Sequence, residues 1–250
     1  MVARKIASPK TSRGTRSIRQ TWADAEVFIF DIEGTLVDAM MPTLRCWRET
    51  LEAFGHDLSL AEIHRYSGMD SDQMLARLLP GTTKNERNEM IEREGAHFRE
   101  EYLPHVPALP GARALLEELK RRGHDIAIAT DCGKDELRHY LEVAKVEDLV
   151  DAIACGNDIR RGKPAANVLE VALRRVRAGR KVAVLVGDTP FDAQAARKVG
   201  VVPVGVLTGH FSERELLDAG CRVVLRDLLA LRAAITRTVA ADADELVSAA

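Results

Sequence analysis

The sequence lacks three features that would indicate a membrane, secreted or nucleic-acid-binding protein. No apolar run approaches the roughly 18 residues that a membrane-spanning helix needs. The four cysteines are scattered without a Cys-x-x-Cys pair, which favours reduced thiols over a disulfide framework or a zinc site. The formal net charge is only −2 at pH 7, so no global field favours nucleic acid or a membrane surface. We therefore expect a cytoplasmic protein with neither kind of partner.

Acidic residues are also missing from the start of the chain. Residues 1–23 carry several arginines and lysines and no acid. They contain no apolar core, so the pattern is not that of a secretory signal. We expect a disordered basic tail over 1–24, with an organelle-targeting segment as the alternative. A second tail is expected over 236–250.

Short runs of Val, Ile and Ala alternate with segments of helical pattern in the rest of the chain. The predicted strands cover 27–31, 125–130, 151–155, 181–188 and 201–206. Nearly continuous apolar runs suit strands that are covered on both faces of a parallel sheet. Intervening helices end on glycine, as at Gly123 and Gly200. The pattern predicts an α/β fold with a doubly wound, Rossmann-like parallel sheet.

One interval, residues 39–108, breaks this alternation. It shows only helical pattern, including a capping box at Ser59 and Glu62. A chain of 250 residues suits one large domain with a modest insert. We therefore predict an all-helical cap over 39–108, inserted into a core made of 25–38 and 109–235. Because the insert leaves directly after the first strand, it should lie over the end of that strand.

Polar residues follow the predicted strands: Asp31, Glu33, Thr130, Asp131, Lys163, Asp188 and Asp192. Ligands of an open parallel sheet bind beyond the carboxyl ends of its strands. Any one of these acids could be a helix cap or a loop residue. Several carboxylates at one edge, however, repel each other unless a cation joins them, and oxygen-rich sites of this kind suit Mg²⁺. Thr130 and Lys163 would then supply a hydroxyl donor and a positive charge to anionic oxygens.

Four motifs stand in order: "DIEGTLVD", "IAIATD", "GKP" and "VLVGDTPFDAQAARKVG". Together they resemble the haloacid dehalogenase-like (HAD) hydrolase superfamily over about residues 25–230. "VPALPGARALLEELKRRG" and "VLTGHFSERELLDAG" are typical of its phosphoglycolate-phosphatase-like branch, whose members carry a helical cap. Four motifs in order on the expected strands make the resemblance specific.

The resemblance implies roles for the acids. Asp31 matches the nucleophile that attacks phosphorus and becomes an aspartyl-phosphate. Position 33 matches the general acid and base, and its backbone carbonyl would also bind Mg²⁺. Asp31 and Asp188 match carboxylate ligands of Mg²⁺, and Asp192 matches a supporting acid. Asp38 is expected to be a hinge or supporting residue, with a plain helix cap as the alternative.

The resemblance also implies a binding site for the phosphorylated substrate. Thr130 and Lys163 match the groups that hold the phosphoryl oxygens, and Gly34 and Asp131 are further candidates for phosphate or substrate binding. The segment 64–75 matches the cap's specificity loop. The candidates there to meet the leaving group are Arg65, Ser67, Gly68, Met69 and Asp70.

Two positions depart from the family pattern. Glu33 stands where phosphatases of the family usually carry aspartate, which moves the carboxylate by about an ångström. Asp131 stands where asparagine or serine is commoner, and its charge beside a phosphate is unfavourable unless it turns away or pairs with a base such as Lys134. Cys132 is expected to be incidental, because Asp31 already supplies a nucleophile.

The expected activity is Mg²⁺-dependent hydrolysis of a small phosphomonoester, similar to phosphoglycolate or a sugar phosphate, by a monomer or homodimer. A phosphomutase and a haloacid dehalogenase on the same scaffold are alternatives. Haloacid dehalogenases lack a carboxylate at position 33, which counts against that activity. A catalytically impaired binding protein is the third alternative, motivated by Glu33 and Asp131.

Overall fold

The computed structural model describes residues 24–237. Apart from their innermost residues, the two predicted tails lie outside the described part of the chain. Within that part, no helix is both long and apolar enough to cross a membrane.

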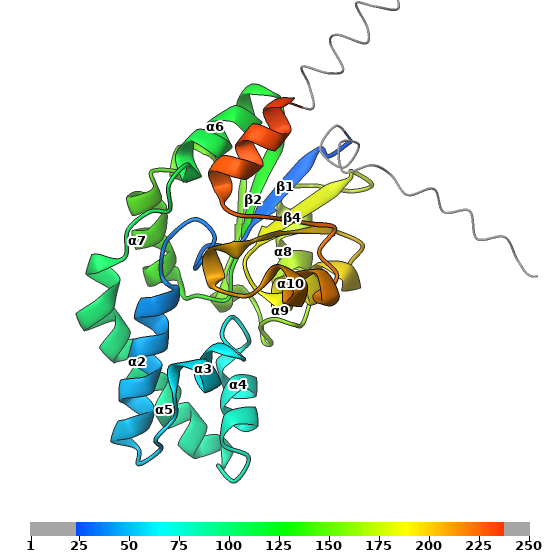
Figure 1. Cartoon of the computed structure of the whole chain (residues 1–250). Coiled ribbons are helices and arrows are strands. Elements are labelled where there is room, and N and C mark those ends of the chain that lie inside the picture. Colours follow the sequence, from blue (N-terminus) through cyan, green and yellow to red (C-terminus); the bar gives the residue numbers. More distant parts are fainter. Residues whose placement is uncertain (1–23, 238–250) are drawn as a thin grey trace, which may run out of the picture.

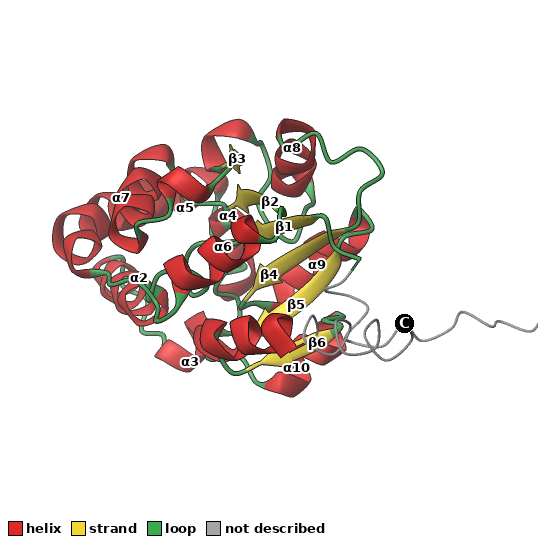
Figure 2. Ribbon diagram, turned by 90° about the horizontal axis from the view of Figure 1, so that it is seen from above, coloured by secondary structure: helices red, strands yellow, loops and turns green. Residues whose placement is uncertain are grey.

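The described residues contain one sheet of six parallel strands (Figures 1 and 2). The strands are β1 (Val27–Phe30), β2 (Asp125–Ala129), β3 (Ala152–Ala154), β4 (Ala183–Gly187), β5 (Val202–Val206) and β6 (Val223–Leu225). Their order is β3-β2-β1-β4-β5-β6, with β1 paired to both β2 and β4. The predicted doubly wound parallel sheet is confirmed. The strand β6 is new, because its three residues give too short an apolar run to predict.

Helices connect the strands on both faces. After β2 and β3 come α7 (Lys134–Ala144) and α8 (Asn167–Arg175), and α6 (Ala112–Arg121) precedes β2. Then follow α9 (Pro190–Lys198), α10 (Glu213–Ala219) and a last helical stretch over 228–237. Short 3₁₀ turns occupy Glu147–Leu149, Gly156–Asp158 and Leu207–Gly209.

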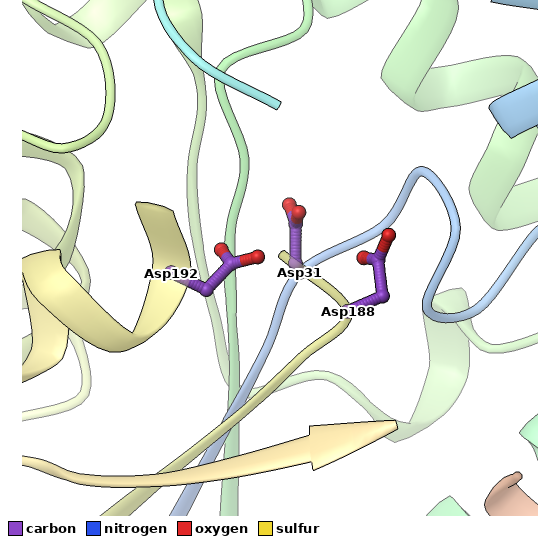
Figure 3. A group of neighbouring side chains, drawn as sticks. All are labelled: Asp31, Asp188 and Asp192. Atoms are coloured by element: carbon purple, nitrogen blue, oxygen red, sulfur yellow. The ribbon is translucent and has the colours of Figure 1, made fainter. Parts of the chain in front are cut away.

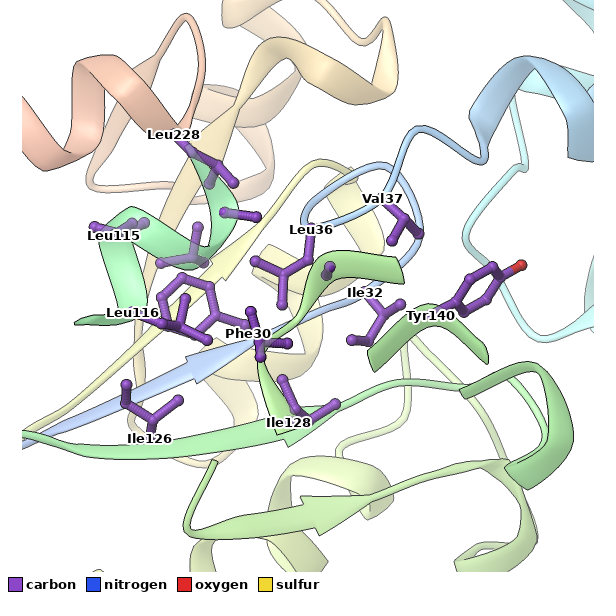
Figure 4. Close-up of a cluster of buried hydrophobic side chains, with 14 of the residues drawn as sticks. Phe30, Ile32, Leu36, Val37, Leu115, Leu116, Ile126, Ile128, Tyr140 and Leu228 are labelled. Carbon is purple, nitrogen blue, oxygen red and sulfur yellow. The ribbon is translucent and has the colours of Figure 1, made fainter. Parts of the chain in front are cut away.

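Alternate residues of each strand face opposite layers of helix. Phe28 and Phe30 of β1 belong to a buried cluster with α6, α7 and the stretch 228–237, which Figure 4 shows around Phe30. Val27 and Ile29 belong to a second cluster with α8 and α9. Both faces of the sheet are therefore covered, which explains why its strands read as unbroken apolar runs.

Residues 39–108 form a helical insert between β1 and β2. It contains α2 (Met40–Ala53), α3 (Leu60–His64), α4 (Ser71–Leu78) and α5 (Lys84–His97), then a π turn (Phe98–Tyr102) and a 3₁₀ turn (Leu103–His105). Figure 1 shows α2 to α5 grouped beyond one end of the strands. They pack around an apolar cluster of their own that includes Trp47. The Ser59–Glu62 capping box is present. The boundaries of a separate cap domain stay a prediction.

Candidate active site

Three aspartates meet where the central strands end (Figure 3). Asp31 directly follows β1, Asp188 directly follows β4, and Asp192 lies in the first turn of α9. All three are buried, and each offers a carboxylate oxygen within 4.8 Å of the others. Because β1 and β4 are hydrogen-bonded neighbours, their carboxyl ends bring Asp31 and Asp188 together. The sheet topology thus gathers acids that lie far apart in the sequence.

Lys163 supplies the positive charge of this group. Its Nζ lies 2.7 Å from Asp31 Oδ1 and 2.8 Å from Asp192 Oδ1, and the residue is only 2% exposed. Burial alone would lower the pKa of Lys163, but the surrounding aspartates raise it well above its usual range. Burial also raises the pKa of Asp31 to about 7, although Lys163 opposes that rise. One ammonium group therefore balances only part of the three negative charges.

Asp192 has a second, structural role. Its Oδ2 accepts hydrogen bonds from the backbone N–H and the hydroxyl of Thr189, which caps α9. Its other oxygen pairs with Lys163. The same carboxylate therefore fixes the start of α9 and steadies the lysine.

The surroundings of Asp188 suit a cation. Its Oδ1 accepts a hydrogen bond from the Thr35 hydroxyl at 2.7 Å, whereas the buried Oδ2 has no hydrogen-bond donor among the described residues. A Cβ atom at Gly34 or at Gly209 would collide with Oδ2, so the backbone approaches this oxygen closely on two sides. Burial raises the pKa of Asp188 well above its usual range, and Asp192 and Asp31 add to the rise. An acidic oxygen set with an excess of negative charge fits a divalent metal ion.

The end of β2 places Thr130 and Asp131 at the same edge. Thr130 is buried, and its Oγ1 accepts a 3.3 Å hydrogen bond from the backbone N–H of Cys132. Asp131 Oδ2 accepts a 2.5 Å hydrogen bond from the backbone N–H of Lys163. Within residues 24–237 Asp131 forms no ion pair with Lys134, so of the two expected alternatives its side chain takes the first and turns to a backbone N–H. Burial raises the pKa of the Cys132 thiol well above its usual value, which agrees with an incidental cysteine.

Glu33 has a hydrogen-bond partner outside the group of three aspartates. Its Oε1 accepts a 2.9 Å hydrogen bond from the phenol of Tyr140 on α7. Burial raises the pKa of Glu33, and the Tyr140 hydrogen bond partly offsets that rise. The longer side chain thus has a partner of its own.

A cavity of about 410 Å³ lies between the strand ends and the helical insert. Asp31, Glu33, Thr130, Asp131 and Lys163 line its core side. On the insert side it is lined by Ser67, Gly68, Met69, Asp70 and Trp47, among others. Four of the five candidates from the specificity loop therefore reach the cavity.

Two predicted site residues lie outside this cavity. Arg65 is exposed at the end of α3 and is not among the lining residues. Asp38 is exposed too, and α2 is capped at Ala39 without a side-chain hydrogen bond, so the alternative of a cap at Asp38 is wrong. The backbone N–H of Asp38 bonds to the carbonyl of Pro107 at 2.9 Å, where the chain enters and leaves the helical insert. That position agrees with a hinge.

Several lining or supporting residues were not among the candidates from the sequence. They are Thr35, Glu94, Glu136, Tyr140, Arg160 and Arg161. Thr35 and the two arginines stand beside motif residues, so their proximity to the site was foreseeable. Glu94 and Tyr140 come from helices far along the chain, and only packing brings them to Glu33.

A lysine and a set of carboxylates at the carboxyl ends of a doubly wound sheet define an α/β protein whose site suits an anionic substrate and a cation. The family comparison agrees: a model described as haloacid dehalogenase-like hydrolase matches residues 28–206. The chain belongs to the haloacid dehalogenase-like hydrolase family.

Relatives and solved structures support this assignment. The chain is 26% identical over 212 residues to a phosphoglycolate phosphatase of Rhodospirillum rubrum, covering 81% of this chain and 88% of that protein. It is 23% identical over 207 residues to a validoxylamine A 7'-phosphate phosphatase of Streptomyces hygroscopicus subsp. limoneus, covering 83% and 96%. A hydrolase structure from Pseudomonas syringae superposes with a TM-score of 0.77 at 31% identity, covering 83% and 95%. The expected HAD-like hydrolase of the phosphatase type is confirmed.

Proposed function

We propose that this protein hydrolyses small phosphomonoesters with Mg²⁺ through an aspartyl-phosphate on Asp31. The observation that carries the proposal is the placement of Asp31, a buried carboxylate 2.7 Å from the Lys163 ammonium and grouped with Asp188 and Asp192. An anionic nucleophile approaches an anionic phosphate only where positive charge offsets their repulsion. Mg²⁺ bound by Asp31, Asp188 and the carbonyl of Glu33 would supply the rest of that charge.

In the first step, a carboxylate oxygen of Asp31 attacks phosphorus and the bond from phosphorus to the leaving oxygen breaks. Glu33 in its protonated form donates a proton to that oxygen. Its pKa, raised by burial, supports this role because the protonated form persists nearer neutral pH. Lys163 and the Thr130 hydroxyl would hold the phosphoryl oxygens.

In the second step, the Glu33 carboxylate takes a proton from a water molecule that attacks the same phosphorus atom. The bond between phosphorus and Asp31 breaks, which releases phosphate and regenerates the carboxylate. The hydrogen bond from Tyr140 would orient Glu33 throughout. A partnered glutamate supports a working acid over an impaired binding protein.

We also propose that the helical insert acts as the cap that selects the substrate. The cavity of about 410 Å³ suits a small metabolite, and the charged residues among its lining, such as Asp31 and Lys163, suit a hydrophilic one. Among the relatives are phosphoglycolate phosphatases and a phosphatase of phosphorylated carbohydrates from Thermotoga maritima. Phosphoglycolate and sugar phosphates are therefore the first substrates to test. The four free cysteines support the proposed cytoplasmic location.

The test is hydrolysis of p-nitrophenyl phosphate, phosphoglycolate and a panel of sugar phosphates, each with Mg²⁺ and with EDTA. We expect Mg²⁺-dependent turnover that Asp31→Asn lowers by at least about 10³-fold, as loss of a nucleophile does in other enzymes. Asp218→Asn, an exposed change on α10, is the matched control. If no substrate turns over faster than with Asp31→Asn, the protein is not a phosphatase. Halide release from L-2-haloacids would instead indicate a dehalogenase.

A further inference from the structure

The backbone that carries Lys163 is held by side chains from two different parts of the molecule. From the core, Asp131 Oδ2 accepts the N–H of Lys163 at 2.5 Å. From the helical insert, Asp70 Oδ2 accepts the N–H of Gly162 at 3.0 Å, and the N–H of Asp70 donates to the carbonyl of Lys163 at 2.8 Å. The polar backbone groups of Lys163 and the preceding N–H are thus all bonded.

Gly162 makes this arrangement possible. A Cβ atom there would collide with Asp131 Oδ2 and would lie 3.1 Å from the Cβ of Asp70. The backbone therefore passes between two acidic side chains, one on each side. A larger residue at 162 would force at least one of them away.

Asp70 also belongs to the framework of the helical insert. Its Oδ1 accepts the N–H of Gln73 at 3.1 Å, which caps α4. The two oxygens of one carboxylate therefore join the start of α4 to the segment that carries Lys163. Movement of α4 relative to the sheet has to break the bonds to Gly162 and Lys163 or carry that segment along.

Among residues 24–237, the other hydrogen bonds and ion pairs between the helical insert and the core end on residues other than Lys163. His64 Nε2 lies 2.8 Å from the carbonyl oxygen of Gly209, and its ring stacks on Phe211 at 4.3 Å. Gly68 lies against Thr189, where a Cβ atom would approach the threonine methyl group too closely. Asp70 is thus the insert residue whose hydrogen bonds end on Gly162 and Lys163.

We propose that Asp70 is a positioning residue that couples closure of the helical insert to the placement of Lys163. With the insert closed, Asp70 and Asp131 hold the segment from both sides, and the Lys163 ammonium meets Asp31 and Asp192. With the insert displaced, the two hydrogen bonds to Asp70 are lost. Only the hydrogen bond from the Lys163 N–H to Asp131 remains, because Asp131 and Lys163 both belong to the core. The proposal deepens the proposed function and rests on it for its activity readout.

The expected loss of rate on displacing Lys163 follows from the geometry of its ion pairs. Lys163 Nζ lies 2.7 and 2.8 Å from its two carboxylate partners, so a shift of its backbone changes both ion pairs at once. Misplacing a catalytic group by about an ångström costs on the order of 100-fold in rate. Asp131, which departs from the family pattern, would hold the Lys163 backbone from the core as Asp70 holds it from the insert.

The test uses a variant that separates the two functions of Asp70. Asp70→Ser keeps an N-cap hydroxyl for Gln73 but has no second oxygen to accept the N–H of Gly162. Asp70→Asn keeps the side-chain length but only one acceptor oxygen, and its amide nitrogen would face the second backbone N–H, so its kcat should fall between those of Asp70→Ser and the wild type. Thr83→Ser, an N-cap exchange at the exposed start of α5, is the matched control.

We expect Asp70→Ser to lower kcat by roughly 10- to 100-fold with little change in Tm. Hydrogen exchange measured by NMR should be at least tenfold faster at the amide of Gly162, while the amide of Lys163 keeps its protection. Wild-type kcat in Asp70→Ser would overturn the coupling, and unchanged exchange at Gly162 would overturn the contact. If Asp70→Ser does not fold, Asp70→Thr, which also keeps an N-cap hydroxyl and lacks the second oxygen, carries both measurements. If the wild type has no turnover, the proposed function fails, whereas the exchange measurement still tests the hydrogen bond between Gly162 and Asp70.

Discussion

Two groups of acids lie at the strand ends and around the adjoining cavity, and their charges are accommodated in different ways. The group of Asp31, Asp188 and Asp192 is buried at the strand ends around the Lys163 ammonium. The glutamate group, Glu33, Glu94 and Glu136, lies toward the helical insert and α7. The aspartates surround a cation within the site.

In the described part of the chain, the glutamates share no central cation of this kind and have separate partners instead. Glu136 pairs with Arg99 at 2.8 Å and Glu33 accepts the Tyr140 hydroxyl. Burial and the nearby Glu33 raise the pKa of Glu94 to about 8. Neighbouring carboxylates are thus stabilised in two ways: the aspartate group by the Lys163 ammonium, and Glu33 and Glu94 by a raised pKa that favours their protonated forms. A hydrolase of the proposed kind needs both, because its nucleophile must be anionic and its acid must carry a proton.

The largest effect should come from removing the cation of the aspartate group. Lys163→Met keeps the length of the side chain and leaves Asp31 and Asp192 without their partner. We expect no measurable turnover and a loss of about 3 kcal/mol in unfolding free energy at pH 8. The loss should shrink at pH 5.5, because the pKa of Asp31 is raised to about 7 and the acid then becomes neutral.

Urea unfolding at the two pH values measures this effect. Lys84→Met, at the exposed start of α5, is the control and should change neither value. An equal loss of stability at pH 8 and pH 5.5 would show that Lys163 acts through packing and not through charge.

An intermediate effect is expected from shortening the acid on the glutamate side. Glu33→Asp moves the carboxylate away from the Tyr140 hydroxyl, so we expect kcat/KM to fall roughly tenfold. Tyr140→Phe alone should cause a similar fall. It should also move the limb of the pH profile that reports Glu33 to higher pH, because the Tyr140 hydrogen bond lowers that pKa.

The double variant decides whether the two residues act together. Glu33→Asp with Tyr140→Phe should be no slower than Glu33→Asp alone, because the hydrogen bond is already lost. A rise in activity with Glu33→Asp would mean that glutamate is a handicap at this position, and additive losses would mean that Tyr140 acts elsewhere.

The smallest effect concerns stability. The pKa of Glu94 is about 8 in the folded protein and ordinary in the unfolded chain, so its neutral form favours folding below about pH 4.5. That contribution is lost as the pH rises toward 8. Glu94→Gln should therefore match the wild type at pH 5 and exceed its Tm by a few degrees, on the order of 1 kcal/mol, at pH 9. Thermal unfolding between these values checks the sign, and a difference independent of pH would contradict it.

Much of the fold was predictable because its signals are local. Five unbroken apolar runs became strands at nearly the predicted residues, since burial on both faces leaves no room for polar residues within them. The strand β6 was missed because three residues carry too little pattern.

The sequence by itself determined which residues meet at the strand ends. Parallel strands bring their carboxyl ends to one edge, so the order of the motifs was sufficient to gather Asp31, Lys163 and Asp188. Only the tertiary structure decided where each side chain points. It turned Asp131 onto the backbone of Lys163, left Arg65 in solvent, and brought Tyr140 to Glu33. These directions depend on contacts between helices and loops far apart in the chain, which no local pattern encodes.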